Sequence, residues 1–296
     1  MAENWCEEEG YVQNGAVKLH YVAAGPVEGE PVLLLHGFPQ SSYLWRRHLP
    51  ALAAKGYRVV APDLRGYNLS DRPAKPEAYR MLNLVGDIGA IYKQLGWQSA
   101  NLVAHDWGGA IGWLFATFYP QQVKRFVAID IPHPTAFREA LQQPAQMRNS
   151  WYIWLFQAAG VAERVIGQNL EEFFNYIMLD QPRAGTYTEA DRQEYLRMLA
   201  QPGQLEAAFN YYRVNTGPAN VYSETASAFP PLKMPVMLVY GSRDFAFIPQ
   251  VWEDTAKFCQ GYFRKVELEG FGHWVLEEAP QETLELICSH LTVPVE

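Results

Sequence analysis

An acidic residue, Asp106, stands where a buried strand must turn sharply into a buried helix. The apolar run 101–104 predicts the strand, and the apolar run 110–116 predicts the helix. Ala104 and Gly108 lie two positions either side of Asp106, which is the small-x-nucleophile-x-small pattern of a nucleophile elbow. A carboxylate at this turn has two interpretations, because it can cap the helix or act as a nucleophile. Residues elsewhere in the chain decide between the two.

Three further segments with reactive or small side chains each follow a predicted strand. They are His36-Gly37-Phe38-Pro39, Gly241-Ser242-Arg243-Asp244 and Gly270-Phe271-Gly272-His273-Trp274. The carboxyl ends of parallel strands share one edge of a sheet, where ligands bind, so we expect these segments to meet Asp106 there. Nucleophile, acid and histidine then occur in the chain order of an α/β-hydrolase triad.

A carboxylate nucleophile narrows the chemistry. An aspartate has a reference pKa of about 3.9, so Asp106 is ionised at neutral pH without a base to activate it. It is a poor nucleophile toward esters and amides, but it can displace a strained oxygen or a halide from saturated carbon and form an ester on the enzyme. His273, oriented by Asp244, would then deprotonate the water that attacks this ester, while the backbone N–H groups of Phe38 and Trp107 hold the oxyanion.

The alternation of strands and helices predicts the fold. Strands are expected at 10–13, 17–23, 31–35, 57–61, 101–104, 126–129, 236–240 and 265–268, and Asn14-Gly15 predicts a hairpin between the first two. This pattern indicates an α/β fold with a mostly parallel eight-stranded sheet flanked by helices.

The stretch from 132 to 232 differs, because it lacks buried-strand runs. It predicts helices at 137–147, 150–158, 170–179, 189–200 and 204–213. We therefore expect a core of residues 1–131 and 233–296 with residues 132–232 inserted as a helical cap.

The composition limits the partners and the compartment. A net charge of −8 provides no basic surface for a phosphate backbone, so we expect no nucleic-acid binding. The sequence has no apolar run that could span a bilayer, and its acidic N-terminus lacks the apolar core of a secretory signal. Cys6, Cys259 and Cys288 suit free thiols in a reducing compartment, so a cytoplasmic location is predicted. Because the histidines are scattered and the sequence has no P-loop, we expect neither a metal nor a cofactor.

The motifs at His36, Asp106, Asp244 and His273 resemble those of the soluble epoxide hydrolases of the α/β-hydrolase superfamily. The resemblance extends over nearly the whole chain and includes His105-Asp106-Trp107-Gly108-Gly109. It implies an α/β-hydrolase fold and the conversion of an epoxide to a vicinal diol.

The resemblance also implies two cap tyrosines that bind the epoxide oxygen. The segment around Tyr152 matches the first, and Asn210-Tyr211-Tyr212-Arg213 matches the second at Tyr212. Tyr211 and Tyr176 are the alternatives. A phenol with a pKa of about 10 stays protonated at pH 7 and can donate to the opening alkoxide.

A related branch, the haloalkane and haloacetate dehalogenases, shares the Asp nucleophile and the His-Gly-Phe-Pro-Gln segment at 36–40. Haloalkane dehalogenases usually have Asn or Glu at the place of Phe38. Fluoroacetate dehalogenases have arginines at the places of Trp107 and Ala110, and a cap histidine at that of Tyr152. These departures favour the epoxide hydrolases.

One feature favours the dehalogenase branch. Asp130, with the following Ile131-Pro132, resembles the triad acid of that branch and so competes with Asp244. We prefer Asp244, because the segment through Phe245 and Pro249 also resembles the epoxide hydrolases.

The sequence therefore predicts an epoxide hydrolase that acts on a small hydrophobic epoxide with water. One alternative is a dehalogenase with the same nucleophile. Another, from a different class, is a hydrolase-fold protein that only binds a small hydrophobic ligand. The complete set of Asp106, His273 and an acid argues against this last interpretation, because binding alone requires no triad.

Overall fold

The computed structural model describes residues 5–179, 186–217 and 229–295. Its centre is an eight-stranded sheet with the spatial order β1-β2-β4-β3-β5-β6-β7-β8. The strands are β1 (Glu8–Asn14), β2 (Val17–Ala24), β3 (Glu30–Leu35), β4 (Tyr57–Pro62), β5 (Ala100–His105), β6 (Val123–Ile129), β7 (Val236–Gly241) and β8 (Phe263–Leu268). β2 pairs antiparallel with β1 and β4, and the other neighbouring pairs are parallel. The predicted mostly parallel sheet is confirmed.

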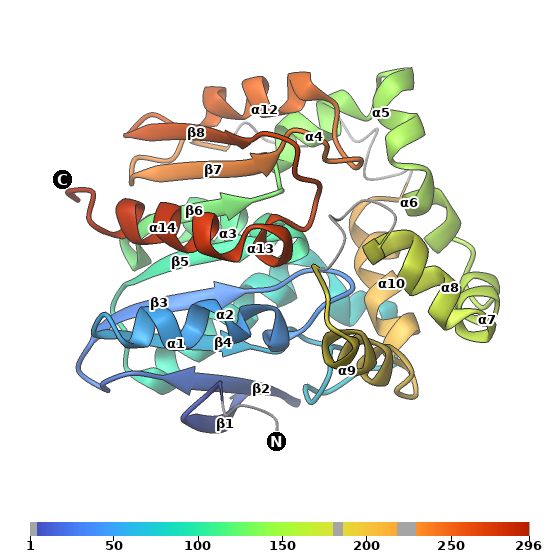
Figure 1. Cartoon of the computed structure of the whole chain (residues 1–296), viewed down its shortest axis with the longest axis horizontal. Helices are drawn as coiled ribbons and strands as arrows, with labels where there is room; N and C mark the ends of the chain where they lie inside the picture. The colour runs from blue at the N-terminus through green and yellow to red at the C-terminus, as the bar shows by residue number, and fades with distance from the viewer. Residues whose placement is uncertain (1–4, 180–185, 218–228, 296) are drawn as a thin grey trace.

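Helices cover both faces of this sheet (Figure 1). α1 (His48–Ala53) and α14 (Pro280–Leu291) lie on one face, and α2 (Met81–Leu95) and α3 (Asp106–Phe118) lie on the other. Successive residues of a strand point to opposite faces, and those of β3 divide between the two buried cores. Burial on both faces explains why the run at 31–35 is apolar without a break.

The shorter elements complete the core. They are 3-10 turns at Ser42–Arg46, Pro76–Tyr79, Pro120–Gln122 and Ala256–Phe258, and the helices α12 (Pro249–Thr255) and α13 (Val275–Glu278).

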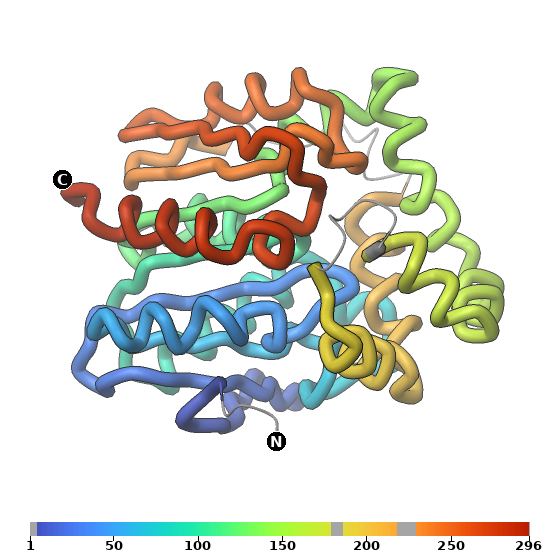
Figure 2. The backbone as a smooth tube through the Cα atoms, in the orientation of Figure 1, coloured from blue at the N-terminus to red at the C-terminus, as the bar shows by residue number. Residues whose placement is uncertain are grey.

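A helical insert connects β6 to β7. Its described helices are α4 (Pro134–Ala140), α5 (Pro144–Asn149), α6 (Trp151–Phe156), α7 (Val161–Gln168), α8 (Leu170–Phe174), α9 (Glu189–Leu199) and α10 (Gln204–Asn215), with a π-helical turn at Asn175–Leu179. The trace in Figure 2 shows α5 to α10 gathered beyond the end of the sheet toward which the parallel strands run in Figure 1. The insert thus lies over the edge where the candidate residues were expected.

The insert differs from the sequence prediction in two places. The helix predicted at 137–147 is two helices, α4 and α5, because Pro144 lacks the N–H that a continuous helix needs and restricts the residue before it. The helix α7 was not predicted, since it is only eight residues long and its apolar pattern spans barely two turns.

A cluster of buried charged and phenolic side chains joins α9 to the core. We call Arg46, Asp191, Tyr195 and Glu277 the seam cluster. The Arg46 guanidinium donates two hydrogen bonds of 2.8 Å to the Glu277 carboxylate and lies 2.8 Å from Asp191 Oδ1. The Tyr195 hydroxyl donates to Glu277 Oε1 at 2.5 Å. Each charge in the cluster therefore has an opposite charge or a hydrogen bond.

Two predictions about the whole chain can be compared with the structure. Cys6, Cys259 and Cys288 are free thiols, as expected. Among the described helices, none has both the length and the apolar character needed to cross a membrane. The compartment stays a prediction.

Candidate active site

Asp106 lies at the sharp turn between β5 and α3. Its φ of 49° is in the left-handed region that non-glycine residues seldom adopt, and its side chain is 14% exposed. The turn brings the chain close to the loop after β3, because a Cβ on Gly108 would lie 2.4 Å from the carbonyl oxygen of His36. A Cβ on Gly37 would lie 2.2 Å from Asp106 Oδ1. Gly37 and Gly108 are thus required by the close approach of the two loops.

Backbone N–H groups contact this carboxylate. The Phe38 N–H donates to Asp106 Oδ1 at 2.7 Å, and a backbone hydrogen bond from Trp107 also contributes to the lowered pKa of Asp106. His36 supports the Phe38 loop, since its Nε2 accepts the Leu64 N–H at 2.9 Å. Both backbone N–H groups predicted to hold the oxyanion therefore contact the Asp106 carboxylate, and the Phe38 N–H does so at Oδ1.

His273 lies between two carboxylates. Its Nδ1 is 2.8 Å from Asp244 Oδ2, and its Nε2 is 3.7 Å from Asp106 Oδ2. The other oxygen of Asp244 accepts the Ala246 N–H at 2.7 Å, which fixes the carboxylate. Asp244, His273 and Asp106 therefore form a continuous row at the carboxyl edge of β5, β7 and β8.

The rival acid, Asp130, follows β6 and is fully buried. Its Oδ1 accepts the Gly241 N–H at 3.0 Å, and its Oδ2 lies 3.8 Å from His105 Nε2. The short contact with His273 Nδ1 belongs to Asp244. The geometry thus favours Asp244 as the partner of His273 while it keeps Asp130 close by.

The charges in this row shift the pKa values of the nucleophile and the histidine in opposite directions. Burial would raise the pKa of Asp106, but the hydrogen bond and charge of His273 lower it. Burial would lower the pKa of His273, but the carboxylates of Asp244 and Asp106 raise it well above its usual value. Asp106 is thus an anion at neutral pH, and its charge helps to keep a proton on His273.

The two predicted tyrosines, Tyr152 of α6 and Tyr212 of α10, face the same cavity as Asp106. Burial and then the charge of Asp106 raise the pKa of both phenols, so both stay protonated. The two alternative tyrosines, Tyr211 and Tyr176, lie elsewhere. The hydroxyl of Tyr211 donates to the Arg65 carbonyl oxygen at 2.6 Å, and Tyr176 is 54% exposed.

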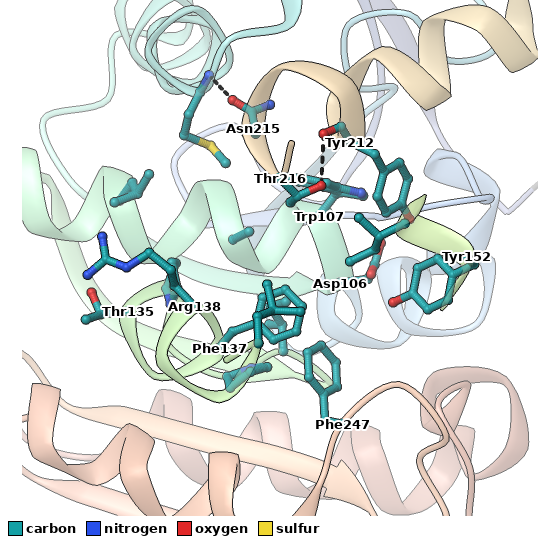
Figure 3. A pocket seen from close by; sticks show the side chains of 18 of the residues that line it. Asp106, Trp107, Thr135, Phe137, Arg138, Tyr152, Tyr212, Asn215, Thr216 and Phe247 are labelled. Atoms are coloured by element: carbon teal, nitrogen blue, oxygen red, sulfur yellow. Dashed lines mark hydrogen bonds between the residues drawn. The ribbon is translucent and has the colours of Figure 1, made fainter. Parts of the chain in front are cut away.

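The cavity has a volume of about 260 Å³ and a mostly apolar lining. Figure 3 shows Asp106, Tyr152 and Tyr212 together at one end, with Phe137 and Phe247 below them and Thr135 and Arg138 at the other end. Its size and lining suit a small molecule that is largely apolar.

Some residues of the site were not predicted from the sequence. His105 donates from Nε2 to the His273 carbonyl oxygen at 3.0 Å, so it supports the histidine loop. Phe137 and Phe247 line the cavity from α4 and from the loop before α12. No local pattern marks an aromatic residue as a lining residue, although the position of His105 beside Asp106 was a usable signal.

One group of side chains has the spacing of a cation site. An oxygen each from Asp130 and Asp244 and a ring nitrogen of His273 lie within 4.8 Å of one another. The 2.8 Å hydrogen bond between His273 and Asp244 already pairs two of the three side chains. We therefore describe the group as an imidazole with two acids.

Comparisons with known proteins identify the family. A family model described as the alpha/beta hydrolase fold matches residues 30–280. Mouse epoxide hydrolase 4 is 34% identical over 287 residues, which cover 95% of this chain and 78% of the mouse protein. Epoxide hydrolase 1 of Caenorhabditis elegans is 32% identical, over 97% of this chain and 70% of that protein.

Solved structures agree. The Bacillus megaterium epoxide hydrolase, crystallised with an inhibitor, superposes with a TM-score of 0.87 at 30% identity, covering 95% of this chain and 99% of that one. Epoxide hydrolase A from Mycobacterium thermoresistibile also gives a TM-score of 0.87, at 26% identity, covering 98% and 99% of the two chains. The chain therefore belongs to the epoxide hydrolases of the α/β-hydrolase fold family, and the resemblance in its motifs is confirmed.

Proposed function

We propose that this protein hydrolyses a small apolar epoxide to a vicinal diol through an ester on Asp106. The observation that carries the proposal is the arrangement around this carboxylate. Oδ1 is held by the Phe38 N–H at 2.7 Å, His273 lies 3.7 Å from Oδ2, and two protonated tyrosines face the same cavity. The family of the chain supports the same reaction.

The first step forms the ester. Asp106 Oδ2 attacks one epoxide carbon, the carbon–oxygen bond of the ring breaks, and the ring oxygen takes a proton from Tyr152 or Tyr212. Two phenols can share the developing charge on this oxygen. A halide would leave without a proton, so paired phenols serve an oxygen leaving group better.

The second step hydrolyses the ester. Once Asp106 is esterified, it no longer offers His273 the carboxylate hydrogen bond that is one of the causes of the raised pKa of the imidazole. The imidazolium can then transfer its proton to the phenolate, and the neutral imidazole can accept another proton from water. That water attacks the Asp106 carbonyl carbon while the Phe38 and Trp107 N–H groups hold the oxyanion. The bond between this carbon and the ester oxygen then breaks, a proton reaches the leaving alkoxide, and the diol departs with an oxygen from Asp106.

Isotopic labelling tests the covalent step. In a single turnover in oxygen-18 water, the diol should contain no label, because its new oxygen comes from Asp106, and the label should stay in the protein. Direct appearance of the label in the diol of the first turnover would contradict the ester.

A second test isolates the ester. His273→Gln should form it but hydrolyse it slowly, so mass spectrometry should detect protein heavier by the mass of one epoxide. No adduct with an epoxide that the wild-type protein hydrolyses would argue against this role of His273.

The runner-up is dehalogenation by the same carboxylate. The indole of Trp107 forms a side-chain hydrogen bond with Tyr212, so its N–H is already used within the protein and is not available to hold a leaving halide. Parallel assays of diol release from epoxides and halide release from haloalkanes and haloacetates rank the two reactions. Faster halide release would reverse our ranking.

A further inference from the structure

Asp130 is an acid at an unfavourable position. It follows β6, it is 0% exposed, and its φ of 46° is in the left-handed region. Oδ1 accepts one hydrogen bond from Gly241, whereas Oδ2 has no hydrogen-bond partner within the described parts of the chain. Burial of a poorly satisfied acid and a positive φ each cost free energy.

The fold alone does not require an acid at this position. An asparagine would accept the Gly241 N–H through its amide oxygen, and it tolerates a positive φ at least as well. It would also avoid burying an ionisable group. What an aspartate offers beyond an asparagine at this position is the capacity for negative charge.

Charged and titratable groups from four elements face Asp130. They are Asp244 after β7, His273 after β8, His105 at the end of β5 and Glu278 of α13. His105 is neutral, because burial lowers its pKa to about 3, and its Nε2 donates to the His273 carbonyl oxygen. The cation within reach of Asp130 is therefore a protonated His273, which lies within 4.8 Å in the group with Asp244.

We propose that Asp130 and Asp244 form an acid pair for His273, in which Asp130 is a positioning residue that holds a second carboxyl group beside the imidazolium. This inference rests on the proposed ester mechanism, in which His273 becomes protonated during hydrolysis.

The electrostatics couple the two acids. Burial and then the charge of Asp244 raise the pKa of Asp130 well above its usual value, which favours the protonated form of Asp130. In Asp244→Asn that second cause is absent, so Asp130 ionises more readily. Two carboxylates this close to each other resist simultaneous ionisation.

A double-mutant cycle tests the pair. The rate of ester hydrolysis is measured in single turnovers of wild type, Asp130→Asn, Asp244→Asn and the double variant. Asp130→Asn should slow wild type a few-fold, and it should slow the Asp244→Asn protein by a factor at least tenfold larger. Equal factors in the two backgrounds would show that Asp130 only supports the structure and would overturn the proposal.

A pH profile adds a readout that a structural role would not change. In Asp244→Asn, acid should slow hydrolysis more steeply than in the double variant, because it protonates both His273 and Asp130 in the former and only His273 in the latter. The same acid dependence in both proteins would count against the pair.

Two controls keep the test decisive. Asp130→Gly, which suits the positive φ, replaces Asp130→Asn if that protein does not fold, and the same non-additivity is expected. Mass spectrometry of the ester separates the acid pair from the ester mechanism. If the ester forms but the rate losses of Asp130→Asn and Asp244→Asn simply multiply in the double variant, only the acid pair is contradicted. No ester with any epoxide contradicts the mechanism itself.

Discussion

The seam cluster and the carboxylates around His273 are two groups of buried charges that differ in how fully they are paired. In the seam cluster, Arg46 lies 2.8 Å from both Glu277 and Asp191, and the neighbouring Arg47 lies 3.3 Å from Glu277 and 3.5 Å from Asp191, so two cations meet two carboxylates. Around His273, three carboxylates surround a single imidazole, and Asp130 Oδ2 has no hydrogen-bond partner among the described residues. A fully paired group stabilises one arrangement of the chain, whereas an excess of acid leaves charge available for a reaction.

This difference predicts separable effects. Substitutions in the site should change the rate of reaction more than the free energy of unfolding, and substitutions in the seam cluster should do the reverse.

Loss of the nucleophile should have the largest effect. Asp106→Asn keeps the shape and tolerates a φ of 49°, but it removes the attacking carboxylate, so we expect kcat/KM for an epoxide to fall about 10⁴-fold or more. The melting temperature should stay near that of wild type. Activity within tenfold of wild type would contradict the assignment of Asp106.

Loss of either proton donor should have the next largest effect. Tyr152→Phe and Tyr212→Phe should each lower the rate of ester formation on the order of 10²-fold, because each removes one donor to the epoxide oxygen. The matched control is Tyr211→Phe, whose hydroxyl donates to Arg65 instead, so its ester formation should change far less. A larger loss of ester formation in Tyr211→Phe than in Tyr212→Phe would mean that Tyr211 is the proton donor.

In the seam cluster, the free energy of unfolding should change most. Glu277→Gln leaves Arg46 with only Asp191 and should cost about 3 kcal/mol, a drop of about 6–12 °C in melting temperature, with activity of the folded protein kept. The control is Arg197→Gln on α9, where Arg197 is 51% exposed and pairs with Glu194, so the cost should be below about 1 kcal/mol. Equal costs would refute the comparison between the two clusters.

The smallest effect concerns pH. Hydrolysis needs neutral His273, so its rate should fall about tenfold per pH unit on the acid side of the imidazole pKa in the ester form. Ester formation should persist there, because Asp106 has a pKa below its usual value and stays ionised. Rapid mixing resolves the two phases, and a parallel decline of both would contradict a base role confined to hydrolysis.

The sequence alone predicted much of the fold. The eight strands, the antiparallel start and the helical insert follow from apolar runs and one hairpin signal, which are local properties of the chain. The errors occurred in the insert, where the predicted helix 137–147 divides at Pro144 and α7 was missed. Short amphipathic helices depend on packing for their stability, so their patterns are weak.

The candidate residues were also recognised from the sequence, because strand ends, motif spacing and the family resemblance identified Asp106, Asp244 and His273. Only the tertiary structure decided which groups meet. It placed Asp244 at 2.8 Å from His273 and Asp130 beside the pair, and it turned Tyr212 rather than Tyr211 toward the cavity. These outcomes depend on distances between segments that lie from 29 to more than a hundred residues apart in the chain, and such distances are fixed by packing of the sheet and the insert rather than by local sequence.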